Sequence, residues 1–330
     1  MLRKLLLPLD GSLQAEAILP HAMMLASAFG TQVDLLHVVA GEEGARPGGP
    51  ADPFEYRVKR AEGASYLAEK AAELEAAGVE VIASRVEEGG AAEVIVALLR
   101  NGAYDAVGLT PHGAGQWRYL SIGCTAVAVI LNAQTSVLLV PDAPRKAGEP
   151  PPSPAAYRRI LAPVDCSPRS DWAVGVAAAI ARRSGARLQL VHVLLAPEVV
   201  NRHPSIGDTR KLADRVVEAN RTEAQKYLDD TIQRHGTSNL SVEGLVLSTE
   251  AGPAEAVRAH AEDEEIDLVI LSAHGRGIST AWPLGGTATK LVFQARKPVL
   301  LLQDLPQEGR LREASPGAGR ALAGDLRASR

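Results

Sequence analysis

Two stretches of the sequence carry small residues at a spacing that suits a phosphate group. In Asp267–Gly286, four apolar residues lead into Ser272-Ala-His-Gly275, and Gly285 opens a helical pattern after nine further residues. Backbone N–H groups of such a loop and of a helix start can donate hydrogen bonds to an anion. Asp105–Cys124 repeats the layout. The sequence therefore predicts two phosphate sites of one design.

A carboxylate accompanies each of these loops. Asp10 and Asp165 each end an apolar, strand-like run that contains a proline, Pro8 or Pro163. An ionised carboxylate only accepts hydrogen bonds, so it suits a ribose hydroxyl or an exocyclic amine and repels phosphate. An adenosine phosphate would use both the loop and the carboxylate. An Asp after a strand also caps the following turn, and only its recurrence together with the loop favours binding over this structural role.

The elements that must position these residues alternate between strand and helix in each half of the chain. The order β-α-β-α-β-α-β-α-β predicts an α/β fold of two tandem, doubly wound, parallel five-stranded sheets with strand order 3-2-1-4-5. In that order, ligands lie beyond the carboxyl ends of the first and fourth strands. Both Asp residues and both loops follow those strands, so topology and composition indicate the same place.

Helix and turn signals fix several boundaries. Ser12 is an expected N-cap of a helix that Pro20 kinks and Gly30 ends. A long charged helix is expected over Tyr56–Ala77, and Ser136–Val140 is expected as the last strand of the first half.

The chain is a tandem duplication. Lys4–Ser12 matches Arg159–Ser167 at an offset of 155 residues, and from Gly90 onward the offset to the second copy is 162 residues. We expect domains at residues 1–142 and 157–303, a linker at 143–156 and a disordered tail at 304–330.

Composition limits the partners and the compartment. A net charge of −4 gives no basic excess for nucleic acid, and no apolar run approaches the ~20 residues of a membrane helix. The chain has 2 cysteines, too few for a disulfide framework, which favours a reducing compartment, the cytoplasm. We therefore expect neither a nucleic-acid nor a membrane partner.

Other residues that could do chemistry are better explained structurally. No P-loop motif and no cluster with metal-ligand spacing occurs. His37, His112, His192 and His274 are interpreted as hydrogen-bonded structural residues. Cys124 and Cys166 are interpreted as small buried hydrophobes, and Trp117 and Trp282 as packing residues. No catalytic residue is assigned, and the chain is not expected to be an enzyme beyond slow incidental ATP hydrolysis.

These motifs resemble the universal stress protein family in a tandem two-domain form. The resemblance lies in L-L-L-P-L-D-G-S and I-L-A-P-V-D-C-S, in L-L-H-V and L-V-H-V, and in D-L-V-I-L-S-A-H-G, L-G-G and K-P-V-L-L-L. It implies a Rossmann-like fold of the adenine-nucleotide alpha-hydrolase type and a cytoplasmic stress-response protein. Some members bind ATP or a related adenine nucleotide, which Mg²⁺ could accompany, and others bind none.

The resemblance also implies the binding residues. In the second half they are Pro163, Asp165, Val193, Ser272, Gly275, Gly285, Gly286 and Thr287. In the first half they are Pro8, Asp10, Val38, Thr110, Gly113, Gly123, Cys124 and Thr125.

Both sites depart from the family pattern G-x-x-G, nine residues, G-[S/T]. Thr110 and Ser272 replace the first glycine, although their hydroxyl groups could donate to phosphate. Cys124 and Gly286 replace the closing Ser or Thr. Binding is therefore expected to be weak and mainly in the second half; the alternative is a structural or interaction protein with vestigial sites. The two halves are expected to pack as an intramolecular pseudo-dimer through Ser136–Val140 and Pro298–Leu302, and a homodimer of whole chains stays open.

Overall fold

The computed structural model describes residues 2–39, 53–101, 103–113, 122–141, 154–195, 206–276 and 283–303, with backbone alone for 53 and 206–214. Its strands are β1 (Lys4–Pro8), β2 (Gln32–Val39), β3 (Val81–Glu88), β4 (Ala106–Leu109), β5 (Ser136–Leu139), β6 (Arg159–Val164), β7 (Arg187–Leu195), β8 (Val242–Thr249), β9 (Leu268–Ser272) and β10 (Val299–Leu302). Its helices are α1 (Leu13–Glu16), α2 (Leu19–Phe29), α3 (Pro53–Ala76), α4 (Ala91–Arg100), α5 (Cys124–Asn132), α6 (Pro168–Ser184), α7 (Ile206–His235), α8 (Pro253–Asp263) and α9 (Gly286–Phe293). The expected tail at 304–330, most of the expected linker, Trp117 and Trp282 lie outside the described residues.

The strands form one sheet with the order β3-β2-β1-β4-β5-β10-β9-β6-β7-β8. Within each half the strands are parallel and follow the predicted order 3-2-1-4-5, so the predicted fold class is confirmed. The halves meet at the centre, where β5 and β10 pair antiparallel, with Leu138 opposite Leu300. The expected pairing of the last strands is therefore present, and it joins two five-stranded sheets into one.

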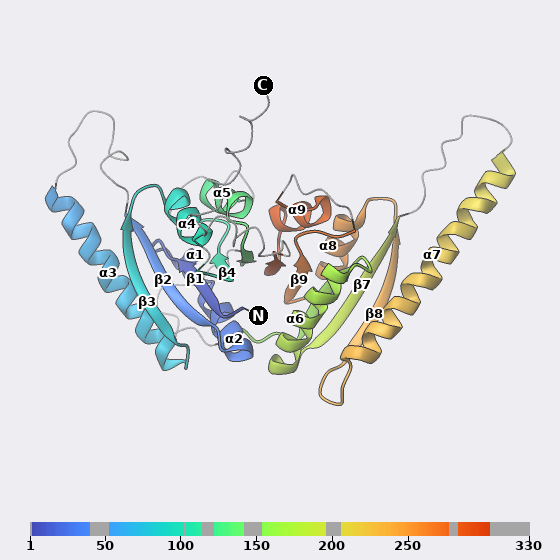
Figure 1. The fold of residues 1–330 in the computed structure, drawn as a ribbon, viewed down its shortest axis with the longest axis horizontal. Helices are drawn as coiled ribbons and strands as arrows, with labels where there is room; N and C mark the ends of the chain where they lie inside the picture. The colour runs from blue at the N-terminus through green and yellow to red at the C-terminus, as the bar shows by residue number, and fades with distance from the viewer. Residues whose placement is uncertain are drawn as a thin grey trace, which may run out of the picture.

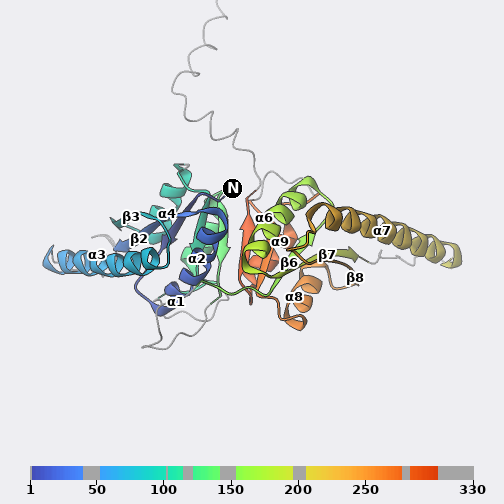
Figure 2. The same ribbon diagram turned by 90° about the horizontal axis from the view of Figure 1, so that it is seen from below.

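Helices cover both faces of this sheet (Figures 1 and 2). The core on one face is formed with α1, α2 and α3 in the first half and with α6 and α7 in the second. The core on the other face is formed with α4, α5, α8 and α9. Both cores cross the central seam, because Leu138 and Leu300 belong to the first and Leu139 and Val299 to the second. The long helices α3 and α7 lie at the two far ends of the molecule (Figure 2).

The first helix of the chain differs from the expectation. The sequence predicts one helix kinked at Pro20, whereas the structure has two helices, α1 and α2, with Pro20 in the first turn of α2. Proline has no N–H to donate to the carbonyl four residues earlier, so the helix breaks and starts again. In the second half Gly175 stands at the corresponding position, and α6 runs unbroken over Pro168–Ser184.

The break lies where the second half docks on the first. The N–H of Ala155, just before β6, donates to the carbonyl of Pro20 at 2.8 Å. His21 Nδ1 lies 2.6 Å from the hydroxyl oxygen of Tyr157, whose side chain is buried. Arg183 Nε of α6 donates to the carbonyl of Ser27 in α2 at 3.1 Å. Polar contacts between the halves thus reinforce the strand pairing at the centre.

Candidate functional site

Two cavities open at the predicted place, one in each half. The first, of about 330 Å³, lies beyond β1 and β4, and the second, of about 580 Å³, lies beyond β6 and β9. All eight residues predicted for the first half line the first cavity: Pro8, Asp10, Val38, Thr110, Gly113, Gly123, Cys124 and Thr125. All eight predicted for the second half line the second: Pro163, Asp165, Val193, Ser272, Gly275, Gly285, Gly286 and Thr287. Each predicted set is thus brought together around one cavity.

The two carboxylates do cap the turn that follows each strand. Asp10 Oδ1 accepts from the N–H of Ser12 at 3.0 Å and from its hydroxyl at 2.6 Å. Asp165 Oδ1 accepts from the N–H of Ser167 at 3.1 Å. The structural role that competed with ligand binding is therefore present in both halves, and the carboxylates also line the cavities.

Asp165 is tied to the opposite side of its cavity as well. Its Oδ2 accepts from the backbone N–H of Arg276 at 2.6 Å, across from β6 to the loop after β9. Burial by itself would raise the pKa of Asp165, but the hydrogen bonds from Ser167, Arg276 and Ser170 outweigh burial and hold that pKa below its ordinary value. Asp165 is therefore ionised at neutral pH.

The glycine of each loop is required by the carboxylate. A Cβ on Gly113 would overlap Asp10 Oδ2, and a Cβ on Gly275 would overlap Asp165 Oδ2. The sequence suggested that these glycines let the backbone approach a phosphate. In the structure, the group that comes this close is the aspartate side chain.

Several groups considered as phosphate donors are hydrogen-bonded within the loops. The hydroxyl of Ser272 donates to the carbonyl of His274 at 2.7 Å, and that of Thr110 donates to the carbonyl of His112 at 2.9 Å, so neither is directed to a ligand. The N–H of Gly285 donates to the carbonyl of Ala273 at 2.7 Å.

Gly123 does the same with the carbonyl of Pro111, also at 2.7 Å. These hydroxyl and amide groups close the loops on themselves, because a short loop leaving a buried strand must satisfy its own polar groups.

Backbone donors for an anion are present at the starts of α5 and α9. Gly123 and Gly285 are their N-caps, and neither helix start has a side-chain cap. In α9 the first backbone bond to the N-cap carbonyl comes from Thr289, at 2.8 Å. The preceding amides, of Gly286, Thr287 and Ala288, belong to the first turn, whose N–H groups have no partner within the helix. All three residues line the second cavity, where these amides and the helix dipole favour negative charge.

The histidines keep the structural roles predicted for them where their contacts are known. Nδ1 of His37 lies 2.8 Å from the carbonyl oxygen of Leu9, and Nδ1 of His192 lies 2.9 Å from that of Val164. Each contact joins the second strand of a half to the end of its first strand. Burial lowers the pKa of His192. His274 is buried beside the second cavity.

The cysteines only partly match the prediction that both are buried. Cys124 is exposed at the start of α5, which contradicts that prediction, because a first-turn residue of this helix faces the open cavity. Cys166 is half-buried, with Sγ 3.7 Å from His192 Nδ1, and burial raises the pKa of its thiol. Its backbone has φ of 60°, a left-handed conformation.

Two arginines at the second site were missed by the sequence reasoning. Arg276 follows Gly275 and lines the cavity, and Arg169 Nη1 donates to the carbonyl of Gly275 at 3.4 Å. A comparison of charged positions between the two copies of the repeat would have revealed them. At the corresponding positions of the first half stand the uncharged residues Ala114 and Gln14.

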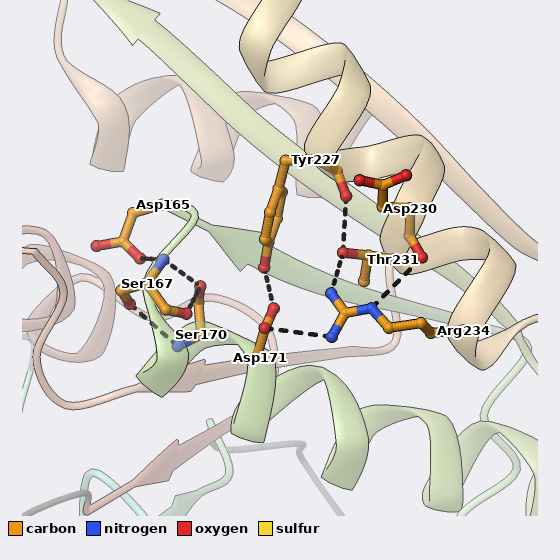
Figure 3. Close-up of polar contacts among 8 residues, drawn as sticks. All are labelled: Asp165, Ser167, Ser170, Asp171, Tyr227, Asp230, Thr231 and Arg234. Carbon is orange, nitrogen blue, oxygen red and sulfur yellow. Dashed lines mark hydrogen bonds and ion pairs between the residues drawn. The ribbon is translucent and has the colours of Figure 1, made fainter.

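A polar network next to Asp165 fastens α7 to the start of α6 (Figure 3). Ser167 and Ser170 form a reciprocal capping box at the N-terminus of α6. On the adjacent turn Asp171 accepts from the hydroxyl of Tyr227 and lies 3.4 Å from Arg234 Nη1, both on α7. The first half has a related arrangement, in which the hydroxyl of Tyr66 on α3 donates to Glu16 at 3.3 Å. These contacts hold the long helices against the ends of the strands that bear the site.

Within the described ranges of the chain, no group of three or more His, Cys, Asp or Glu is placed to hold a metal ion. None of the helices that the structure describes is both long enough and apolar enough to cross a membrane.

Comparisons with known proteins agree with the fold. The profile of the Universal stress protein family matches residues 1–141 and 156–303. A universal stress protein of Thermus aquaticus is 29% identical over 147 residues, which are 44% of this chain and 99% of that protein.

Solved structures are similar as well. A universal stress protein of Archaeoglobus fulgidus, 19% identical, has a TM-score of 0.58 and covers 91% of this chain and 98% of its own. Another from the same organism, in complex with dAMP, is 19% identical with a TM-score of 0.32 and covers 45% of this chain and 99% of its own.

Proposed function

Because the chain belongs to the universal stress protein family, we propose that it binds an adenine nucleotide such as ATP, weakly and mainly in its second half. The proposal rests on the second cavity, where an ionised acceptor, Asp165, and the uncapped start of α9 face one space of about 580 Å³. The carboxylate suits a ribose hydroxyl or the adenine amine, and the helix start suits phosphate. The apolar residues Val193 and Leu271 offer the base a surface to pack on.

Titration calorimetry with ATP, ADP, AMP and cAMP, with and without Mg²⁺, tests the proposal directly. Binding in the millimolar range or tighter is expected, and no heat of binding from any of the four ligands would reject it. The Mg²⁺ arms show whether the ion accompanies the nucleotide.

One variant and its matched control test whether the binding lies in the second half. Thr287→Glu places a negative charge in the first turn of α9, where it repels phosphate yet favours the helix by about 0.3–1 kcal/mol. A loss of affinity is then not expected to come from unfolding, and an unchanged melting temperature checks this. Thr125→Glu is the equivalent change in α5 and should leave most of the affinity in place. Equal losses in both variants would contradict the preference for the second half.

A third variant tests the contact missing at Gly286. A Cβ on Gly286 would meet no atom within 4 Å, so Gly286→Ser can supply the hydroxyl of the family pattern without a clash. One additional neutral hydrogen bond is worth about 0.5–1.5 kcal/mol, which corresponds to roughly 2- to 12-fold tighter binding.

A second candidate function is that of a structural or interaction protein with vestigial sites. It is favoured by the loop groups that hydrogen-bond internally, the hydroxyls of Thr110 and Ser272 and the N–H groups of Gly123 and Gly285. Under this alternative the purified protein releases no nucleotide on denaturation and shows no thermal shift with ATP. Mass spectrometry of the released small molecules separates the two candidates.

The nucleotide is proposed as a ligand and not as the substrate of an evolved enzyme. Any phosphate release is expected to be slow and, at saturating nucleotide, unchanged in Asp165→Ala, because Asp165 is proposed to bind the ligand and not to act as a general base. We place this binding in a cytoplasmic stress response, in keeping with the family and with two free cysteines. Association of two whole chains is a further proposal, which sedimentation of the purified protein tests.

A further inference from the structure

The second site carries two arginines that have no counterpart in the first. On the basis of the proposed function, we infer that Arg276 and Arg169 make the second site select its ligand by the number of phosphate groups, so that ATP and ADP bind more tightly than AMP and adenosine.

Arg276 is held at the cavity by its own backbone. Its N–H donates to Asp165 Oδ2 at 2.6 Å, which fixes the residue where the loop leaves β9. Its side chain is exposed and lines the cavity, and it makes no ion pair with the residues that the structure describes. Burial is the main reason that the pKa of His192 is low, and the positive charge of Arg276 adds to it, so that charge acts on the cavity wall.

Arg169 approaches the same loop from a different element. It is in the first turn of α6, and its Nη1 donates to the carbonyl of Gly275 at 3.4 Å, so the guanidinium group lies against the loop. A cation in the first turn of a helix opposes the helix dipole. The position of Arg169 is thus unfavourable for the dipole of α6, and its bond to Gly275 ties it to the loop of the second site.

Positive groups on three elements therefore lie in this cavity or against its loop. Arg276 from the loop after β9 and the first turn of α9 line the cavity, and Arg169 from α6 lies against the same loop through the carbonyl of Gly275. The opposing negative group, Asp165, has both carboxylate oxygens engaged by backbone N–H groups. Each added phosphate of a ligand brings negative charge, and charge-assisted contacts with guanidinium groups are stronger than neutral ones.

The first half has no charge at the positions of the two arginines. Gln14 and Ala114 occupy the positions of Arg169 and Arg276. Among the described residues that line the first cavity, Asp10 is an acid and none is an arginine or a lysine. That cavity is also smaller, about 330 Å³ against about 580 Å³. Discrimination by phosphate number is therefore expected from the second site and not from the first.

The test is an affinity series with ATP, ADP, AMP and adenosine, by calorimetry at low salt without Mg²⁺, on the whole chain. The affinity of the native protein should rise with each phosphate. Arg276→Gln and Arg169→Gln should each weaken ATP binding by roughly three- to tenfold, the range for a partly exposed charge pair, and leave adenosine binding unchanged. Added salt should weaken ATP binding more than adenosine binding.

Arg182→Gln is the control for the loss of one positive charge. Arg182 is exposed in the last turn of the same helix, 13 residues from Arg169 and so roughly 20 Å along the axis, beyond the screening length. The Arg182→Gln variant should bind all four ligands with the affinities of the native protein. Adenosine affinity and the melting temperature report on folding, and Arg169→Gln should not lower that temperature, because it removes a cation from a helix start.

The outcomes separate the inference from the proposed function. Binding of all four ligands with similar affinity, or equal losses for ATP and adenosine in the arginine variants, would overturn the inference and leave nucleotide binding intact. Failure of every ligand to bind would reject the proposed function and this inference with it.

Discussion

At the scale of single residues, Cys166 has a backbone that its side chain does not favour. Its φ of 60° is in the left-handed region, where a residue with a Cβ is strained. The first half has Gly11 at the corresponding position, with φ of 83°. The same turn is therefore made with a relaxed residue in one copy and a strained one in the other.

This difference predicts opposite effects on stability of adding a Cβ at one position and removing it at the other. Cys166→Gly should raise the free energy of unfolding by about 0.5–1 kcal/mol, since relief of strain exceeds the added flexibility of the unfolded chain. Gly11→Ala should lower it by about 1 kcal/mol, through backbone strain alone, because a Cβ there meets no atom within 4 Å. Urea unfolding of both variants measures the changes, and a loss of stability in Cys166→Gly would mean that the thiol's packing outweighs the strain.

The sequence located residues that line the two cavities but not their hydrogen bonds. Spacing and the repeated Asp placed sixteen residues around two cavities, because loops after adjacent parallel strands must meet at one edge of the sheet. Spacing could not show that Ser272 would donate to His274, because a hydroxyl rotates freely and the closure of the loop decides its partner. Arg169 escaped notice since its contact with Gly275 joins residues 106 positions apart.

At the scale of elements, the break between α1 and α2 leaves His21 in a contact between the halves. Its ring lies against Tyr157, with ring centroids 5.6 Å apart, and burial lowers the pKa of His21 to about 4. Proline at Pro20 was recognised from the sequence as a kink, but whether a helix bends or restarts depends on what packs at the break. Here the segment before β6 packs at the break, where the N–H of Ala155 donates to the carbonyl of Pro20.

The buried histidine predicts a loss of stability in mild acid. His21 is neutral in the folded chain, whereas in the unfolded chain it takes up a proton near pH 6.5. The folded state therefore loses stability as pH falls from about 6.5, and the loss is complete near pH 4, at about 3 kcal/mol at most. Chemical unfolding at several pH values should show a shallower decline in His21→Gln than in the native protein.

Tyr157→Phe serves as the control for this effect. It removes the hydrogen bond to His21 but keeps the ring buried. The free energy of unfolding of this variant should therefore be lower at every pH, with the same dependence on pH as in the native protein. An unchanged acid decline in His21→Gln would assign the effect to other groups.

At the scale of the whole molecule, the two halves share their hydrophobic cores. Leu138 and Leu300 are both buried and face each other across the antiparallel seam, and each core contains residues from both halves. Strand order within a half was predictable from right-handed crossovers and the switch-point rule. The continuation of both cores through the seam was not predictable from the sequence, because it depends on how side chains from the two copies pack together.

Shared cores predict cooperative unfolding. Calorimetry of the native chain should show one heat absorption peak, since neither half can unfold without exposing the other's apolar residues. Leu300→Ala, which opens a cavity at the seam at a cost of about 2–5 kcal/mol, should separate the peak into two. Two resolved peaks in the native chain would contradict the prediction.

The antiparallel join between β5 and β10 also affects how the copies can change. In a dimer of identical subunits every substitution occurs twice, once on each side of the symmetry axis, so the two subunits stay chemically alike. In a single polypeptide each copy is encoded separately, and a change on one side is not imposed on the other. The second cavity can therefore have arginines beside it while the first half has Gln14 and Ala114 at the matching positions. One polypeptide can in this way hold two binding sites of unequal charge.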